Sequence, residues 1–233
     1  MPDVMFLDRE QAGWLLVARL RDRCRVPGAG ARPLVLAIPR GGVEVGAVLA
    51  RGLSADLDVV LARKLRAPGR PELAVGAVSE EGEVVFNSFA RSLPGVDDAW
   101  IDTERALQMA EIARRRAMFR AVRPQAPIAG RTVILTDDGL ATGATMIAAL
   151  RTVRAAGAER IIVALPVGSP ERLATIERLC DRLECLEQPR DFIAVGQYYR
   201  SFEQVSDERV VVLLREFGVA STPWPSLQAS ASA

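Results

Sequence analysis

Two adjacent carboxylates, Asp137 and Asp138, follow an apolar run in the segment VILTDDGLATGAT, residues 133–145. Small residues come next and lead into a pattern with helical spacing, and small side chains leave the first backbone N–H groups of a helix uncovered. Those donors and the helix dipole bind anions, a phosphate monoester above all. The carboxylates can accept hydrogen bonds from sugar hydroxyls or hold a metal ion through water. The segment therefore predicts a ribose 5-phosphate site, whose small residues are Ala141, Thr142, Gly143, Ala144 and Thr145.

Several other kinds of site are excluded by what the sequence lacks. Histidine is absent, so the chain cannot build a Ser-His-Asp or Cys-His machine, or a His-ligated zinc or haem site. Neither G-x-G-x-x-G after a strand nor G-x-x-x-x-G-K-[ST] occurs, which excludes the usual dinucleotide and P-loop sites. The cysteines Cys24, Cys180 and Cys185 lack paired spacing and are predicted to be buried small hydrophobes. A simple helix-capping role for the two acids is disfavoured because neighbouring carboxylates repel each other unless a ligand or cation uses them.

The charge of the chain says little in favour of a polyanionic or membrane partner. The formal net charge is +1, so neither nucleic acid nor an anionic lipid surface is expected to bind the chain as a whole. No apolar run reaches the ~18 residues of a membrane span, and no secretory signal is visible, so a cytoplasmic location is expected.

Lys64 is the sole lysine among 30 basic residues, which indicates that a compact ammonium is needed at that position. The run Arg114–Arg116 is read as a solvated helix face, with contact to an anion as the alternative.

Alternating strands and helices predict the scaffold that carries these residues. Short apolar runs at 34–38, 57–62, 131–136, 160–165 and 183–186 are typical of buried parallel strands. Helical spacing follows Asp8 and recurs at 43–53, 98–121, 143–156 and 170–183. We therefore expect one α/β domain over residues 1–220, doubly wound around a mainly parallel sheet, with ligands beyond the carboxyl ends of the strands. Residues 221–233 are expected to form a disordered tail.

Two segments depart from this alternation. Residues 67–88 hold turn residues around two short strand-like runs, 73–78 and 83–86, which favours a β-hairpin lid over a crossover helix. Residues 190–205 lie outside the predicted sheet and, with the N-terminal helix, are expected to form a small hood over the site.

The segment 133–145 resembles the phosphoribosyl pyrophosphate (PRPP) signature of type I phosphoribosyltransferases, in which an apolar strand, two acids and a T-G-x-T loop succeed one another. Pro39-Arg40-Gly41-Gly42 is similar to the pyrophosphate loop of that family, which often holds a non-proline cis peptide. Ala62-Arg63-Lys64 resembles the basic end of the next strand, and residues 67–88 match the place of the mobile lid. Over roughly 34–207 the chain looks like a bacterial branch that is described only as predicted phosphoribosyltransferases.

The resemblance implies displacement of pyrophosphate from PRPP by a nitrogenous or other small nucleophile, with Mg²⁺ as cofactor. Asp137, Asp138 and Lys64 are the catalytic residues that it implies. No dedicated metal ligands are expected, because Mg²⁺ would be held mainly by PRPP oxygens and water, with Asp137 or Asp138 as the protein's candidates. The substrate-binding residues that it implies are Arg40, Gly41, Gly42, Arg63, Gly139, Ala141, Thr142, Gly143, Ala144 and Thr145.

The acceptor is the least determined part of the prediction. Gly139 stands where the family usually has a bulkier apolar residue, and Ala141 stands where the 6-oxopurine branch has an aspartate, so hypoxanthine or guanine salvage is not expected. Tyr198 and Tyr199, with Phe192 and Phe202, either stack on a flat base in the hood or pack the hood against the core. The expected partners are PRPP, a small-molecule acceptor and, as one option, a second copy of the chain. Two other functions stay open: a PRPP- or nucleotide-sensing binding protein without turnover, and a phosphohydrolase.

Overall fold

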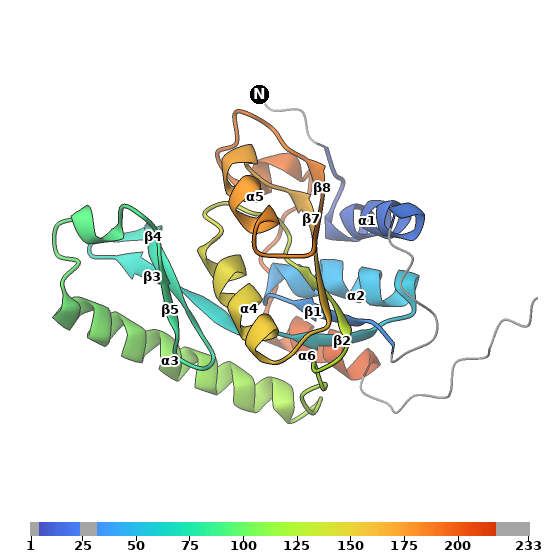
Figure 1. Cartoon of the computed structure of the whole chain (residues 1–233), viewed down its shortest axis with the longest axis horizontal. Helices are drawn as coiled ribbons and strands as arrows, with labels where there is room; N and C mark the ends of the chain where they lie inside the picture. The colour runs from blue at the N-terminus through green and yellow to red at the C-terminus, as the bar shows by residue number, and fades with distance from the viewer. Residues whose placement is uncertain (1–4, 24–31, 218–233) are drawn as a thin grey trace, which may run out of the picture.

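Five short strands form a parallel sheet at the centre of the protein. The computed structural model describes residues 5–23 and 32–217, so Cys24 and the tail at 221–233 lie outside the described residues. The strand order is β2-β1-β6-β7-β8 and every pairing is parallel, which confirms the predicted fold class (Figure 1). The strands are β1 (Leu34–Ala37), β2 (Asp56–Val59), β6 (Thr132–Thr136), β7 (Arg160–Val167) and β8 (Arg182–Glu187).

Helices cover both faces of this sheet because its strands are apolar on both faces. Val35 and Ala37 of β1 pack in one core cluster with α1 (Arg9–Arg23), α2 (Gly41–Leu53) and α6 (Asp207–Glu216). Leu34 and Leu36 pack in the other, whose helical residues come from α4 (Ala144–Ala155) and α5 (Pro170–Glu177). Alternate residues of one strand thus face opposite layers, as a doubly wound sheet requires.

The segment predicted to form a hairpin lid belongs to a larger antiparallel sheet, and the name lid is kept for that sheet. The expected strand at 57–62 divides: β2 ends at Val59, and a new strand begins at Ala62 and leaves the parallel sheet. It starts a three-stranded antiparallel sheet that projects along α3 (Asp98–Arg120) (Figure 1). Its strands are β3 (Ala62–Ala67), β4 (Arg70–Ser79) and β5 (Val84–Phe86). The residues that sequence patterning assigned to the end of a core strand, Arg63 and Lys64, therefore lie at the root of the lid.

Hydrogen bonds near the helix ends bear on both the agreements and the differences between prediction and structure. The side chain of Asp8 accepts from the Gln11 N–H at 2.8 Å, which begins α1 as expected. The helix predicted at 170–183 ends at Glu177 instead, because the chain turns and the Asp181 carboxylate accepts from the Ile161 N–H at 2.7 Å. The sequence analysis does not predict α6, although Ser206 caps it by accepting from the Arg209 N–H at 3.1 Å.

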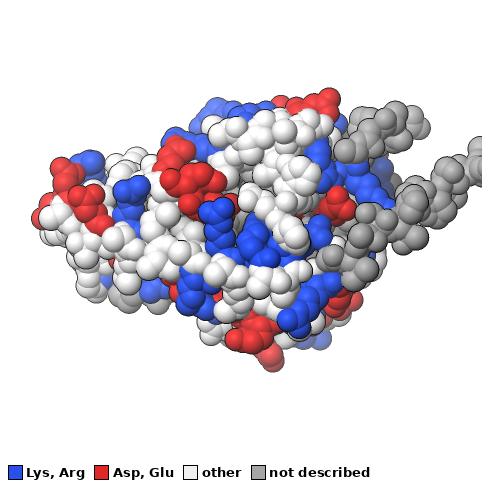
Figure 2. Space-filling model, turned by 90° about the horizontal axis from the view of Figure 1, so that it is seen from below, with Lys and Arg blue, Asp and Glu red and all other residues white. Residues whose placement is uncertain are grey.

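Two smaller expectations concern surface and cysteines. Within the described residues, no helix combines the length and apolarity that a bilayer span requires. Basic and acidic side chains are interspersed on the face shown in Figure 2 and do not separate into a surface of one sign. Cys185 is buried, as predicted, whereas Cys180 is only partly buried.

Candidate active site

The loop after β6 leads into α4 without a side chain that caps the helix. Gly143 stands at the N-cap with φ 80°, and no side chain caps the helix. A Cβ built on Gly143 meets nothing within 4 Å, so the space in front of the helix is open. The loop is held from behind, since the Leu140 N–H donates to the Val167 carbonyl of the neighbouring strand at 2.8 Å. An open, anchored helix start of this kind is suited to bind a phosphate.

Asp137 and Asp138 lie between this loop and the β1–α2 turn. The Asp138 N–H donates to Oδ1 of Asp137 at 2.8 Å, so the first carboxylate is oriented by the backbone of the second. Removal from bulk water, followed by the negative charge of Asp138, raises the pKa of Asp137, while Lys64 acts in the opposite direction. Asp137 is therefore costly to keep ionised unless a ligand or a further cation lies close by.

The β1–α2 turn approaches these acids so closely that only glycine fits. A Cβ on Gly41 would lie 1.9 Å from Oδ2 of Asp138, and one on Gly42 would lie 2.8 Å from the Cα of Asp137. The peptide bond between Pro39 and Arg40 in this turn is cis. The two glycines thus bring the turn into direct contact with both acids.

Most of the predicted site residues line two adjoining cavities. The larger, about 240 Å³, brings the two acids together with Gly41, Thr145 and four cations. The smaller, about 100 Å³, shares both acids, Lys64 and Thr145 and is also lined by the loop 139–143, Met146 and Val195. Gly42 and Ala144 line neither cavity. Gly42 packs against the backbone of Asp137, and Ala144 is buried within α4. The four cations are Arg40, Arg63, Lys64 and Arg66.

Arg9 is a site residue that the sequence analysis missed. Its Nε donates to Oδ2 of Asp138 at 2.9 Å, and its Nη1 donates to the backbone carbonyl of Glu203 at 2.9 Å. The guanidinium also lies over the ring of Phe202, 4.0 Å from the centroid. Arg9 is only 7% exposed, so it joins the N-terminal helix and the hood to one of the two acids. No local pattern marks this residue, because its partners are far away in the sequence.

The hood tyrosines are packed inside the protein. Tyr198 and Tyr199 are 1% and 4% exposed, and they stack on Phe192 and Phe202, respectively. The Tyr199 hydroxyl donates to the backbone carbonyl of Asp138 at 2.7 Å. Their burial favours the alternative in which these tyrosines pack the hood against the core, and argues against stacking on a base. Phe192 differs, since it also lines a third cavity of about 510 Å³ beside Ala141 and Thr142.

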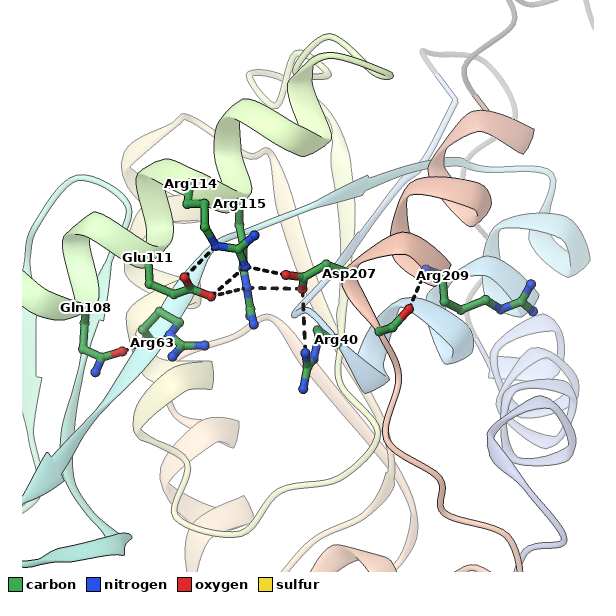
Figure 3. Close-up of polar contacts among 9 residues, drawn as sticks. Arg40, Arg63, Gln108, Glu111, Arg114, Arg115, Asp207 and Arg209 are labelled. Atoms are coloured by element: carbon green, nitrogen blue, oxygen red, sulfur yellow. Dashed lines mark hydrogen bonds and ion pairs between the residues drawn. The ribbon is translucent and has the colours of Figure 1, made fainter.

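The arginine run of α3 is not a uniformly solvated face, which corrects that expectation. Arg115 is 7% exposed and pairs through Nε with Glu111 at 3.0 Å and Asp207 at 3.3 Å. Figure 3 shows Asp207 between these α3 residues and Arg40, whose Nη1 lies 3.9 Å from its Oδ1. A hydrogen bond from Arg114 lowers the pKa of Glu111 to about 2. Sequence spacing could not reveal this burial, because Asp207 belongs to the unpredicted α6.

Fold and site together define an α/β protein that gathers two acids, a phosphate-type loop and several cations at the carboxyl edge of a parallel sheet. The family model described as "Phosphoribosyl transferase domain" matches residues 9–202, and the chain belongs to this family.

Relatives of known sequence or structure agree with that assignment. Two strains of Mycobacterium tuberculosis have proteins named as candidate phosphoribosyl transferases that are 41% identical to this chain over 210 residues, 90% of its length. The match covers 46% of each relative, so the chain spans about half the length of the curated relatives it matches. The crystal structure of TT1426 from Thermus thermophilus is 43% identical, with a TM-score of 0.73, covering 92% of this chain and 99% of that one.

Proposed function

We propose that the protein is a Mg²⁺-dependent phosphoribosyltransferase that moves the 5-phosphoribosyl group of PRPP to a nitrogenous acceptor and releases pyrophosphate. The observation that carries this proposal is the convergence of Asp137, Asp138 and Lys64 on both adjoining cavities, with the amide-lined loop on one side and Arg40 and Arg63 on the other. A phosphorylated pentose with a pyrophosphate group needs three kinds of group in its site. These are hydrogen-bond acceptors for the hydroxyls, donors for the phosphate, and cations for the leaving group.

Each part has a role in displacement at the anomeric carbon. The transition state resembles an oxocarbenium ion, so positioning and charge stabilisation supply the rate enhancement and no protein nucleophile is needed. Asp137 and Asp138 bind the ribose hydroxyls, and the loop 139–145 binds the 5-phosphate. Arg40, Arg63 and Lys64 stabilise the negative charge that develops on the departing pyrophosphate.

The residues present fit a magnesium ion that is bound mainly through the substrate. Among the described residues, no group of three or more His, Cys, Asp or Glu could hold a metal ion. Asp137 and Asp138 are the carboxylates that line both adjoining cavities. Burial, and then the charge of Asp138, raises the pKa of Asp137, so an added cation would stabilise its ionised form. Mg²⁺ retains water readily, which suits a site with few protein ligands. When bound, it would neutralise charge on the pyrophosphate group.

We propose that the acceptor enters the cavity of about 510 Å³ between the phosphate loop and the hood. Phe192 offers an aromatic surface there, in place of the buried tyrosines. Ala141, on the loop side, has no group to bond a base edge, so a 6-oxopurine acceptor is not proposed.

The direct test is to mix the protein with PRPP, Mg²⁺ and a panel of purines, pyrimidines and small amines and to measure pyrophosphate. Release with at least one acceptor is expected, and replacement of both Asp137 and Asp138 by Asn should abolish it. Asp102→Asn, an exposed acid on α3, is the matched control. Lys64→Ala should weaken pyrophosphate binding more than ribose 5-phosphate binding.

Other outcomes would assign a different function. PRPP binding in calorimetry without turnover against the whole panel would identify a PRPP-sensing binding protein. Phosphate release from sugar phosphates without an acceptor would identify a phosphohydrolase.

A further inference from the structure

Gln108 is a buried amide on the face of α3 that meets the root of the lid. It is 4% exposed, although it lies in the middle of a helix whose other polar residues are mostly at the surface. Gln108 lies beside Arg63 (Figure 3), and its Oε1 accepts from Nε of Arg63 at 3.0 Å. Its Nε2 donates to Oε1 of Glu104 at 3.0 Å. Glu104 also accepts from the backbone N–H of Arg66 at 3.1 Å. A buried polar residue with these partners has a role beyond filling the core.

The two partners determine which way the amide of Gln108 is turned. A carboxylate such as Glu104 only accepts and a guanidinium such as Arg63 only donates. The amide nitrogen must therefore face Glu104, and the amide oxygen must face Arg63. This arrangement engages Nε of Arg63 and leaves the four N–H groups on its two terminal nitrogens for another ligand.

Glutamine at this position orients Arg63 without neutralising it. Arg63 lines the cavity of about 240 Å³ that contains both acids. Within residues 5–23 and 32–217 no carboxylate forms an ion pair with Arg63. Arg115, on the same side, is in contrast paired with both Glu111 and Asp207. Burial, followed by the charge of Arg115, lowers the pKa of Arg63, while the charge of Glu111 acts in the opposite direction. An anion that enters the cavity would compensate the charge of Arg63.

We propose that Gln108 is a positioning residue, which holds the Arg63 guanidinium at the cavity and leaves its charge available to the pyrophosphate group. The inference rests on the proposed function, because it assigns the anion of that cavity as pyrophosphate. The residue acts through Arg63 and does not touch the substrate itself.

The test compares two ligands by titration calorimetry in the presence of Mg²⁺. Gln108→Met keeps the length of the side chain and removes both hydrogen bonds. Freeing one long side chain costs about 0.5–1.5 kcal/mol on binding, so pyrophosphate should bind about 2- to 13-fold more weakly. Ribose 5-phosphate, which has no pyrophosphate group, should bind as it does to the wild-type protein. Gln188→Met, at an exposed glutamine, is the matched control and should change neither affinity.

Two further variants separate positioning from a general structural role. In an Arg63→Met background, Gln108→Met should cause no additional loss of pyrophosphate affinity. Gln108→Glu keeps the acceptor but adds a negative charge beside Arg63, so it should weaken pyrophosphate binding as well; it also serves if Gln108→Met does not fold.

The proposal is overturned if the Gln108 variants bind pyrophosphate as the wild-type protein does, if both ligands weaken equally, or if the loss persists without Arg63. If the wild-type protein binds no pyrophosphate at all, the proposed function itself fails together with this inference. Wild-type binding that is insensitive to Gln108 removes only the positioning role.

Discussion

Arg9→Met removes the cation that holds Asp138, and its effect can be worked out from the contacts of Arg9. The pair is largely withdrawn from water, with side-chain exposures of 8% for Arg9 and 16% for Asp138. The substitution keeps most of the side-chain volume and removes the 2.9 Å ion pair with Asp138, a longer one of 3.5 Å with Glu44 and the bond to the Glu203 carbonyl. It also ends the contact of a cation with Phe202. It also leaves the Asp138 charge beside a second acid.

The expected loss of stability is large for a single substitution. Breaking a buried ion pair by removing one partner costs about 3–5 kcal/mol, and the lower end applies because Asp138 keeps some contact with water. A loss of about 3 kcal/mol should lower Tm by about 6–12 °C for a chain of this size. The ribose site should suffer too, because Asp138 would no longer be held toward the sugar.

Denaturant titration of a double-mutant cycle checks this estimate. We expect Arg9→Met and Asp138→Asn to be coupled by about 2 kcal/mol, because residues in direct contact are not additive. Arg91→Met provides the control, since its pair with Asp98 is exposed, and pairs of that kind contribute at most about 1 kcal/mol. If Arg9→Met costs no more than Arg91→Met, or costs the same with and without the Asp138 carboxylate, the reasoning is wrong.

Three other substitutions test the rest of the site. Asp137→Asn should abolish pyrophosphate release. It should also raise the free energy of unfolding by about 1 kcal/mol at neutral pH, because folding raises the pKa of Asp137 and so disfavours its ionised form. A variant that melts at a lower temperature than the wild-type protein would contradict this. The bond from Arg114 lowers the pKa of Glu111 from 4.5 to about 2, so its ionised form stabilises the fold above pH 4.5 and that contribution is lost as pH falls toward about 2. Glu111→Gln should therefore flatten the decline of stability in that window, as measured by denaturation at a series of pH values. Gly41→Ala would place a Cβ 1.9 Å from the Asp138 carboxylate, so kcat/KM for PRPP should fall on the order of 100-fold while circular dichroism stays unchanged.

The sequence alone predicted the core strands and much of the candidate site, because their signals are local. Apolar runs closed by glycine and proline predict strands, because a buried parallel strand needs apolar residues on both faces. The segment 133–145 predicts a phosphate and ribose site, because two acids and uncapped amides stand next to each other along the chain. Lys64 is notable by composition alone. Each of these signals is contained within a few neighbouring residues, so no folding information is needed to see it.

Contacts between distant segments were decided by the tertiary structure alone. Arg9 meets Asp138 across 129 positions, and Arg63 meets Gln108 across 45. The sequence favours a solvated face for the run that contains Arg115, but α6 brings Asp207 against that residue. The sequence also leaves two roles open for the hood tyrosines, and only their burial favours packing against the core. Amino-acid type states what a side chain can donate, accept or bury. Only the folded chain decides which partner a side chain meets and how far the two are withdrawn from water. The partner and the degree of burial together determine the charge and the orientation of that side chain.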